Sequence, residues 1–380
     1  MSNPLTFSLV AGEASGDLLA SLLLSGMRAR WPDLQARGIG GPHMQRQGFE
    51  AWWPSEKLAV RGYVEVLRHY RSIVRIRQQL QQRLLAHPPS AFIGVDAPDF
   101  NLDLARELKA AGIPTIHFVC PSIWAWRANR VEKIRRSVDH VLCIFPFEPE
   151  LLAQHGIEAT YVGHPLAQSI PTQVDQAAAR EKLGLPTQAR VVALLPGSRA
   201  SEIEYLCERF LRSAQEMARQ APDLHFVLPA MPSLKSRIEA IAQSVGYLPN
   251  LRILTGQSHD ALAACDVTLI ASGTATLEAA LFKRPMVIAY NMHWLSWQIM
   301  RRKKLQAWVG LPNILCGEFV VPELLQDQAS PEAMAHEVMQ WLQSPSRVKQ
   351  LVQRFDQLHD NLRRDTSTLA TDAIEKVLAR

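Results

Sequence analysis

The sequence predicts an α/β protein built from two doubly wound domains of similar design. A strand, a glycine-containing turn and a helix open the chain at Leu5, and the same order returns at Arg190. The 380 residues are too many for one ordinary core and suit two domains of roughly 150–200 residues each. We expect a first domain at 1–165, a proline-containing connection at 166–189, a second domain at 190–345, and helices at 346–380 that pack back on the first domain or on a partner subunit.

In the first half, each expected strand ends in a polar or glycine-rich turn. Leu5 to Val10 precedes GEASGD at 12–17, and a second glycine-rich turn, GIGGPH, follows at 38–43. The next strands are the apolar runs at 91–95, 115–120 and 140–145, followed by DAPDFN, PSIWAWR and PFEPE. GIGGPH lacks the full GxGxxG order, so it is a weak dinucleotide-binding fingerprint.

The second half repeats this alternation. VVALLPGSRASEIEYL is again strand, glycine turn and helix, and apolar runs follow at 225–230, 251–256, 267–272 and 285–290. Helical stretches lie between these runs, and helices rich in Gln, Arg and Leu complete the chain from about Pro331. This order predicts a second parallel sheet.

Composition indicates a globular protein that works in a reducing compartment. Hydrophobic residues make up 47% of the chain and charged residues 20%. Five cysteines form no CxxC pair and cannot all pair within one chain, so we expect a cytoplasmic location. No segment approaches about 18 unbroken apolar residues, and the N-terminus lacks an export pattern, so neither a membrane span nor a signal is expected.

Positive charge is concentrated in three short segments. The net charge is +5, yet residues 61–83 carry +5, residues 127–136 carry +4 and residues 301–304 carry +4. Such segments favour an anionic surface or anionic substrates. No zinc-finger, RNP or homeodomain-like pattern is present, so nucleic acid is not an expected partner.

The stretch from Leu269 to Tyr290 reads as strand, tight turn, helix and strand with almost no spare residues. Ser272, Gly273 and Thr274 offer N–H groups and hydroxyls at a helix start, which suits an anion. Glu278 lies one helical turn further on, where its carboxylate can reach a ribose diol. The alternative is an ordinary N-capped helix with an acidic residue near its start.

The turn DAPDFN supplies the candidate catalytic base. Asp96 follows a run of apolar strand residues, where partial loss of water raises the pKa of a carboxyl group. A base of this kind contributes roughly 10²–10⁴-fold in rate. The alternative is a turn fixed by Pro98, and the choice of Asp96 over Asp99 as the base stays open.

The remaining polar turns have a ligand-binding interpretation and a structural one. In GEASGD, small residues let the backbone approach a ligand, with Glu13 and Asp17 as polar contacts, although a capped turn is the alternative. Trp124, Trp126 and Arg127 of PSIWAWR could line a sugar-binding or acyl-binding site, although tryptophans are commonly core residues. In PGSRASE, Gly197 and Ser198 can donate to an anion and Arg199 can bind phosphate bidentately. Asn313 in PNIL can bind a base or a phosphate.

Metal chemistry is not expected. The sequence has no DxD, no HExxH and no cysteine cluster, so we expect the charge of a leaving group to be met by Arg199 and by helix N-termini.

Taken together, these turns make the sequence resemble the lipid-A-disaccharide synthase family of glycosyltransferases. Six motifs match in order over nearly the whole chain: GEASGD, DAPDFN, PSIWAWR, LLPGSR with the following Glu202, SGTATLE and LPNIL. The resemblance implies the GT-B architecture, with two Rossmann-like doubly wound domains facing across a cleft. It implies a metal-independent, inverting transfer, without a cofactor, of 2,3-diacylglucosamine from UDP to the 6-hydroxyl of lipid X, giving a β-1,6 disaccharide and UDP. The pathway would be lipid A biosynthesis in Gram-negative bacteria.

The resemblance also implies a role for each matching position. Asp96 would be the base on the acceptor hydroxyl. The donor nucleotide would be bound by Gly197, Ser198, Arg199, Glu202, Ser272, Gly273, Thr274, Thr276, Glu278 and Asn313. The acceptor and sugar cleft would be lined by Glu13, Ser15, Gly16, Asp17, Asp99, Asn101, Trp126 and Arg127. The partners would be UDP-2,3-diacylglucosamine, lipid X and an anionic membrane surface, with a homodimer left open.

Three alternative functions explain the sequence less completely. A non-hydrolysing UDP-sugar epimerase can share the architecture but needs no basic amphipathic surface. A dinucleotide-dependent oxidoreductase would carry GxGxxG after its first strand, where this chain has GEASGD. A purely structural binding module would leave the polar turns unexplained.

Residues 63–84 are expected to form an amphipathic helix that rests on the inner membrane. At 100° per residue, Arg68, Arg71 and Arg75 form a stripe. The opposite face is apolar and consists of Tyr63, Val66, Leu67, Tyr70, Ile73 and Val74. Attraction to anionic lipid of roughly 1 kcal/mol per basic residue predicts reversible, salt-sensitive attachment. The alternative is an ordinary surface helix packed on the core.

Overall fold

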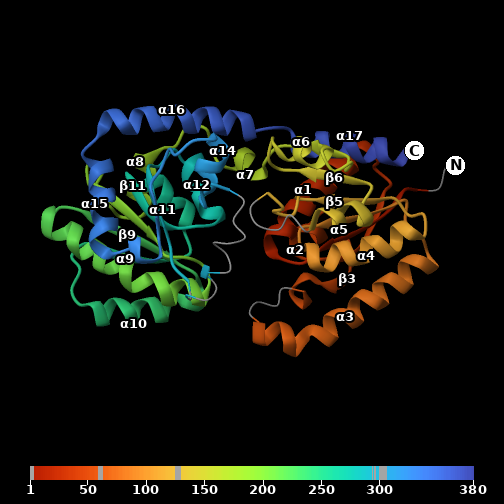
Figure 1. Ribbon diagram of the computed structural model, residues 1–380, viewed down its shortest axis with the longest axis horizontal. Helices are drawn as coiled ribbons and strands as arrows, with labels where there is room; N and C mark the ends of the chain where they lie inside the picture. Colours follow the sequence, from red (N-terminus) through yellow and green to blue (C-terminus); the bar gives the residue numbers. More distant parts are fainter. Residues whose placement is uncertain (1–3, 59–62, 125–129, 293, 295–296, 299–305) are drawn as a thin grey trace. The chain divides into compact units, whose positions relative to one another are not determined.

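The computed structural model describes residues 4–58, 63–124, 130–292, 294, 297–298 and 306–380, apart from the side chains of residue 14 and residues 63–70. The chain divides into two compact units, Met1–Gln168 with Leu362–Arg380 and Ser169–Asn361. Each unit contains one parallel sheet covered by helices (Figure 1). The second unit thus includes residues 169–189, which is nearly all of the segment expected as a connection.

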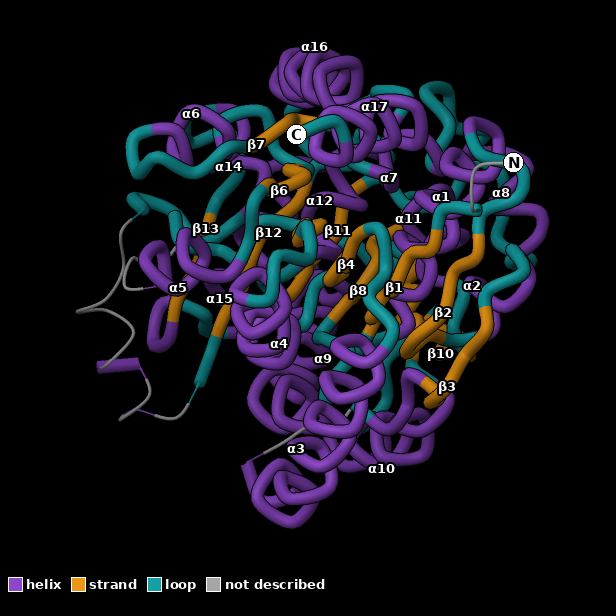
Figure 2. Tube along the Cα trace, turned by 90° about the vertical axis from the view of Figure 1, so that its right-hand side faces the viewer, coloured by secondary structure: helices purple, strands orange, loops and turns teal. Residues whose placement is uncertain are grey.

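The sheet of the first unit has seven parallel strands in the order β3-β2-β1-β4-β5-β6-β7. β1 lies between β2 and β4, so the strand order reverses at this point (Figure 2). The strand bounds are β1 Thr6–Ala11, β2 Gln35–Gly40, β3 Glu50–Pro54, β4 Ala91–Val95, β5 Thr115–Phe118, β6 His140–Cys143 and β7 Ala159–Tyr161. β1 and β4 are almost wholly buried and apolar, as expected for parallel strands covered on both faces.

The helices of the first unit alternate with these strands. They are α1 Ala14–Arg30, α2 Pro42–Arg46, α3 Tyr63–Ala86, α4 Pro98–Ala110, α5 Arg130–Ser137, α6 Glu148–Ala153, α7 Pro165–Ser169 and α17 Thr366–Leu378. The last helix, α17, packs against α1 although more than three hundred residues separate them in the sequence. Gly26 permits this contact, because a Cβ there would lie 2.7 Å from the Ser367 carbonyl oxygen. Arg30 adds ion pairs to Asp372, at 2.7 Å, and to Glu375.

The sheet of the second unit has six parallel strands in the order β10-β9-β8-β11-β12-β13, with its reversal between β8 and β11. The strand bounds are β8 Val191–Leu195, β9 His225–Ala230, β10 Leu251–Thr255, β11 Val267–Ala271, β12 Met286–Tyr290 and β13 Glu323–Leu325. The helices are α8 Gln176–Lys182, α9 Ala200–Gln220, α10 Lys235–Val245, α11 Ser258–Ala264, α12 Thr274–Leu281, α14 Leu311–Cys316, α15 Pro331–Leu342 and α16 Pro345–Leu362. Only α17 of the expected terminal helices belongs to the first unit.

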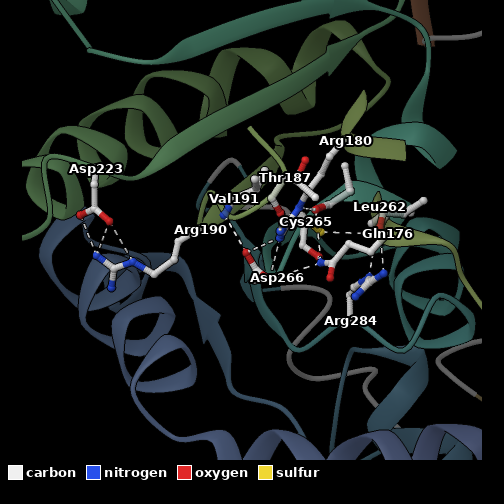
Figure 3. A network of polar contacts seen from close by, with 12 residues as sticks. Gln176, Arg180, Thr187, Arg190, Val191, Asp223, Leu262, Cys265, Asp266 and Arg284 are labelled. Carbon is white, nitrogen blue, oxygen red and sulfur yellow. Dashed lines mark hydrogen bonds and ion pairs between the residues drawn. The ribbon is translucent and has the colours of Figure 1, made fainter. Parts of the chain in front are cut away.

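A polar network fixes α8 to the second sheet (Figure 3). The Arg180 guanidinium is buried and donates to both carboxylate oxygens of Asp266 at 2.9 Å. Asp266 in turn accepts from the Val191 N–H at 2.7 Å, at the start of β8, and Gln176 donates to the Cys265 carbonyl at 2.8 Å. These bonds are why the residues around α8 belong to the second unit.

Candidate active site

The turns after β1 and β4 meet at the strand-order reversal of the first unit. Ala11 pairs with Val95 at the ends of these neighbouring strands, so GEASGD and DAPDFN leave the sheet side by side. A Cβ at Gly12 would lie 3.1 Å from the Ala97 Cβ, which is a tight contact, so the glycine lets the two turns approach closely without displacing Ala97. Ligands of open parallel sheets bind at such reversals, beyond the carboxyl ends of the strands.

Asp96 has the environment of a general base. Its side chain is half-buried, and loss of water raises the pKa of its carboxyl group, with the nearby Glu13 carboxylate adding to the effect. Asp99 differs, because its carboxylate is 79% exposed and pairs with Arg130 at 2.6 Å. The geometry therefore favours Asp96 over Asp99 as the base.

The backbone at Asp96 is strained, and hydrogen bonds with Asn101 and Phe118 hold it in this conformation. Asp96 and Ala97 have φ values of 52° and 41°, in the left-handed region that costs non-glycine residues energy. The Asn101 side-chain amide donates to the Asp96 carbonyl oxygen at 2.8 Å, and the Asp96 N–H donates to the Phe118 carbonyl at 2.9 Å. These bonds set the direction in which the Asp96 carboxylate points.

Two residues expected in the acceptor cleft lie inside the fold instead. Asn101 has 0% exposure because its amide is directed at backbone carbonyls beneath the turn. Asp17 is 2% exposed and accepts from the N–H groups of Gly41, His43 and Met44 at the start of α2. In this geometry both side chains are engaged by backbone groups and position the turns.

The other expected acceptor-side residues have mixed placements. Ser15 is exposed at the start of α1, Glu13 is half-buried beside Asp96, and Gly16 is buried, where a Cβ would lie 3.6 Å from the Val95 carbonyl oxygen. Trp126 and Arg127 lie outside the described residues. Their neighbour Trp124 is buried and donates its indole N–H to Glu148 at 3.0 Å, so it is a core residue.

A pocket of about 360 Å³ in the second unit gathers most of the expected nucleotide residues. It is formed by the turns after β8, β9, β10 and β11 and by the first turns of α12. Of the expected residues, the pocket is lined by Gly197, Ser198, Arg199, Glu202, Ser272, Gly273, Thr274 and Glu278. The strand-order reversal between β8 and β11 is what brings the two motifs together.

The turn after β8 is organised by Glu202. Its carboxylate accepts from the backbone N–H groups of Ser198, at 2.8 Å, and Arg199, at 3.1 Å, as part of a capping box. The Ser198 N–H, expected as a phosphate donor, donates to Glu202 in this structure. The Arg199 guanidinium pairs with Glu202 at 2.9 Å and is 68% exposed, so it can turn toward an anion.

The turn after β11 is open at the start of α12. Gly273, with a φ of 154°, is exposed, and no atom lies within 4 Å of a Cβ built there, so a ligand can reach the backbone. The first N–H groups of a helix lack partners within that helix and attract anions. Thr276 is fully buried, and its hydroxyl donates to the Gly273 carbonyl at 2.7 Å. Thr276 therefore shapes the turn and does not line the pocket.

Asn313 also acts inside the fold. It is fully buried, accepts from the Val320 and Val321 N–H groups, and donates to Glu323 at 2.8 Å. Glu323 accepts from the Val309 N–H at 2.9 Å, and the Ser272 hydroxyl donates to the Val309 carbonyl at 3.1 Å. In this geometry the Asn313 amide is bonded within the fold and supports the Ser272 turn.

Sequence reasoning missed several residues of this pocket. Met231 and Ser258 line it, and the His259 ring lies 3.8 Å from the Glu278 carboxylate, which raises the pKa of His259. Burial raises the pKa of the Tyr290 hydroxyl, and Glu202 reinforces the effect. Met231 and Ser258 follow β9 and β10, and Tyr290 is the last residue of β12. These positions at the carboxyl edge of the sheet were the available signal, because the same edge carries the predicted motifs.

The structure corrects the expectation that the cysteines do not cluster. Cys120, Cys143 and Glu148 are buried, and one ligand atom from each lies within 4.8 Å of the others. The two Glu148 oxygens already accept from the Trp124 indole N–H and the Phe145 N–H. Burial raises the pKa of Glu148 to about 7 despite these bonds. Both oxygens of the Glu148 carboxyl group thus have hydrogen-bond donors within the protein, and we assign this cluster no role in the reaction.

Helix α3 is anchored by its C-terminal half. Ile76, Leu80 and Leu84 are buried, while Ile73 and Val74 of the expected apolar face are half-buried. Arg71 and Arg75 are exposed, as expected, and the side chain of Arg68 lies outside the described residues. Among the described helices, none is long and apolar enough to cross a membrane.

Comparison with known proteins agrees with this geometry. Residues 7–377 match the model of a family described as lipid-A-disaccharide synthetase. The lipid-A-disaccharide synthase of Albidiferax ferrireducens is 62% identical over 383 residues, covering 100% of this chain and 98% of the relative.

Solved structures extend the comparison to the fold. The calicheamicin glycosyltransferase CalG4 has a TM-score of 0.61 at 17% identity, covering 100% of this chain and 99% of its own. A UDP-GlcNAc 2-epimerase from Neisseria meningitidis has a TM-score of 0.63 at 12% identity, covering 98% and 99%. At these identities the likeness concerns the fold alone, and it confirms the expected α/β GT-B architecture with two Rossmann-like domains. The motifs, the two strand-order reversals and the full-length match to the family model agree, and the chain belongs to the lipid-A-disaccharide synthase family of glycosyltransferases.

Proposed function

We propose that this chain transfers 2,3-diacylglucosamine from UDP to the 6-hydroxyl of 2,3-diacylglucosamine 1-phosphate, lipid X, with inversion at the anomeric carbon. The products are the β-1,6-linked tetraacyl disaccharide 1-phosphate and UDP. The observation that carries the proposal is the pair of polar sites at the two strand-order reversals, one with a carboxylate of raised pKa and one with an anion-binding helix start.

In the proposed reaction, Asp96 removes the proton of the acceptor 6-hydroxyl. The hydroxyl oxygen then attacks the anomeric carbon of the donor, and the bond from that carbon to the UDP oxygen breaks. Loss of water raises the pKa of Asp96, which brings its basicity closer to the working pH. The left-handed turn at Asp96 and Ala97 fixes the direction of attack.

The pocket of the second unit binds the donor in this proposal. The start of α12, with Gly273 and Thr274 exposed, receives the diphosphate, and Glu278 binds the ribose hydroxyls. Arg199 turns from Glu202 toward the diphosphate and meets the negative charge that develops on UDP. This set of groups is the basis for proposing a reaction that needs no divalent metal.

We further propose that α3 attaches the protein reversibly to the inner face of the cytoplasmic membrane, where acylated substrates reside. Support comes from the exposed Arg71 and Arg75, since each basic residue near anionic lipid contributes roughly 1 kcal/mol. Changing both to Ser should reduce sedimentation with anionic liposomes at low salt, and unchanged sedimentation would remove this role.

The central test is the Asp96→Asn variant with both lipid substrates. UDP release should need lipid X in the wild type, and the variant should keep UDP binding while losing about 10²–10⁴-fold in turnover. Asp99→Asn is the comparison that separates the two candidate bases, because that carboxylate is exposed and paired with Arg130 and should be the less important of the two for turnover. UDP release without lipid X, accompanied by an epimerised sugar, would favour the epimerase alternative.

A further inference from the structure

A cavity of about 840 Å³ lies on the first unit, away from the residues assigned above. Its walls come from β2, the edge strand β3 and the C-terminal half of α3. The cavity is lined by Arg37 from β2, Trp52 and Trp53 from β3, and Gln79, Gln82 and Arg83 from α3. The volume falls within the range of roughly 300–1,000 Å³ that is typical of small-molecule sites.

A β-bulge brings the two tryptophans to the same side of the edge strand. Gly38 pairs with Ala51 and Ile39 pairs with Trp53, so Trp52 is the extra residue of β3. In a regular strand, consecutive side chains point to opposite faces. Here the Arg83 guanidinium lies 4.9 Å from the Trp52 ring centroid and 5.5 Å from that of Trp53. Bulges that re-aim side chains in this way are common beside functional sites.

The two arginines are oriented by these rings rather than by acids. The Arg37 guanidinium lies 5.4 Å from the Trp52 ring centroid. Within the part of the chain that the structure describes, neither Arg37 nor Arg83 forms a side-chain hydrogen bond or ion pair. Arg77 of the same helix, by contrast, pairs with Asp103 at 2.7 Å. Stacking on an indole leaves the N–H edge of a guanidinium open to an anion.

The charge around the cavity is positive. No Asp or Glu lines it, and His87 adds an imidazole to the two guanidinium groups. The Glu50 carboxylate, which does not line the cavity, accepts from the Trp52 indole N–H at 3.0 Å. Two unpaired guanidinium groups suit an anion with several oxygens, because each can form two parallel hydrogen bonds.

We propose that this cavity binds the phosphate group of a ligand, with Arg37 and Arg83 as its charged partners and Gln79 and Gln82 as additional donors. The indole faces left free by the arginines, together with Ala86, would contact the apolar or sugar part of the same ligand. A phospholipid head group and a soluble phosphate share this chemistry. The site is independent of the donor pocket and of Asp96.

The test follows the indole N–H signals of the full-length protein by two-dimensional NMR. The chain has nine tryptophans, and Trp52→Phe and Trp53→Phe assign the two signals of interest. The probes are inorganic phosphate and a short-chain phosphatidylglycerol below its micelle concentration, each compared with chloride at equal ionic strength. We expect saturable shifts of the Trp52 and Trp53 signals while the other seven signals stay in place.

Arginine variants distinguish specific binding in the cavity from non-specific attraction between positive charge and the anion. Arg83→Gln and Arg37→Gln should each weaken binding by about tenfold or more, and Arg83→Lys should restore little, because a lysine cannot form the bidentate contact. Arg106→Gln is the matched control, since Arg106 is exposed on α4 and pairs with Glu107 outside the cavity.

Each outcome decides the proposal. Saturation by inorganic phosphate supports a soluble ligand, and saturation by the phospholipid alone supports a lipid head group. The proposal is overturned if neither probe shifts the two signals saturably. It is also overturned if Arg83→Gln binds as tightly as the wild type, or if Arg106→Gln weakens binding equally. Unchanged signals of the other tryptophans show that each variant is folded.

Discussion

Replacing Asn101 with Ala should reduce both stability and turnover, because the Asn101 amide holds the backbone of Asp96. The amide nitrogen donates to the Asp96 carbonyl oxygen at 2.8 Å, with longer contacts of 3.4 Å to Val95 and 3.3 Å to Val10. Loss of a donor from a fully buried site leaves carbonyl oxygens unpaired, which costs about 1–3 kcal/mol. We therefore expect the free energy of unfolding to fall by about 2 kcal/mol.

The effect on turnover follows from the strained turn. Left-handed backbone costs about 1–2 kcal/mol per non-glycine residue, and both Asp96 and Ala97 adopt it. Without the Asn101 amide the turn can relax and displace the carboxylate. A misplacement of about 1 Å can cost about 100-fold in rate. We expect kcat to fall between about tenfold and 100-fold, with KM for the donor unchanged because the donor pocket lies in the second unit.

The pH profile distinguishes positioning from simple destabilisation. Loss of water raises the pKa of Asp96, so a relaxed, more hydrated turn should move the acidic limb of kcat/KM to lower pH. Asn250→Ala is the matched control. Asn250 also has a left-handed backbone, and its amide donates to Leu224 at 3.2 Å and Pro222 at 3.3 Å, in the second unit. Wild-type turnover together with an unmoved acidic limb in Asn101→Ala would refute this reasoning.

Three further predictions concern the donor pocket, its charge and the buried carboxyl group. Glu278→Ala should weaken UDP binding by about 1–3 kcal/mol in calorimetry. It should also lower the pKa of His259, because the Glu278 carboxylate raises that pKa. Unchanged UDP affinity would mean that Glu278 is only a helix-start residue. Turnover should persist in EDTA because Arg199 and the start of α12 can meet the charge of UDP, and activity lost in EDTA and restored by Mg²⁺ would contradict this. Glu148→Gln should flatten the loss of stability with rising pH. Burial raises the pKa of Glu148 from 4.5 to about 7, so the folded state holds that proton more tightly than the unfolded chain does. This contribution of roughly 3 kcal/mol is fully present below pH 4.5 and is lost as pH rises from 4.5 to about 7. Urea unfolding of both proteins between about pH 5 and 8 measures this difference, and parallel curves would contradict the assigned burial cost.

Sequence patterns alone predicted the positions of these strands and polar turns to within a residue or two of their observed bounds. The predicted strand at 91–95 is β4, and the predicted run at 267–272 exceeds β11 by one residue. Both periodicity and turn composition are local properties, so a single sequence contains them. The same local signals led to the family, because each of its motifs is a short turn with a fixed residue order.

The direction in which each polar side chain points was harder to predict from the sequence. Asp17, Asn101 and Asn313 belong to ligand-like motifs, yet each satisfies backbone groups within the fold. Buried backbone N–H and carbonyl groups must find partners, and a short polar side chain beside a ligand site is often the one that supplies them. Whether such a residue contacts ligand or backbone depends on neighbours that are remote in the sequence.

The sequence by itself determined that two strand–turn–helix series exist, where their polar turns lie, and to which family they belong. Only the tertiary structure decided which turns meet, because strand order is set by packing between segments far apart in the chain. β1 pairs with β4 and β8 with β11, although about eighty residues separate the members of each pair. The same long-range packing stacked Arg83 on the re-aimed Trp52 and Trp53, a site that no local pattern predicted.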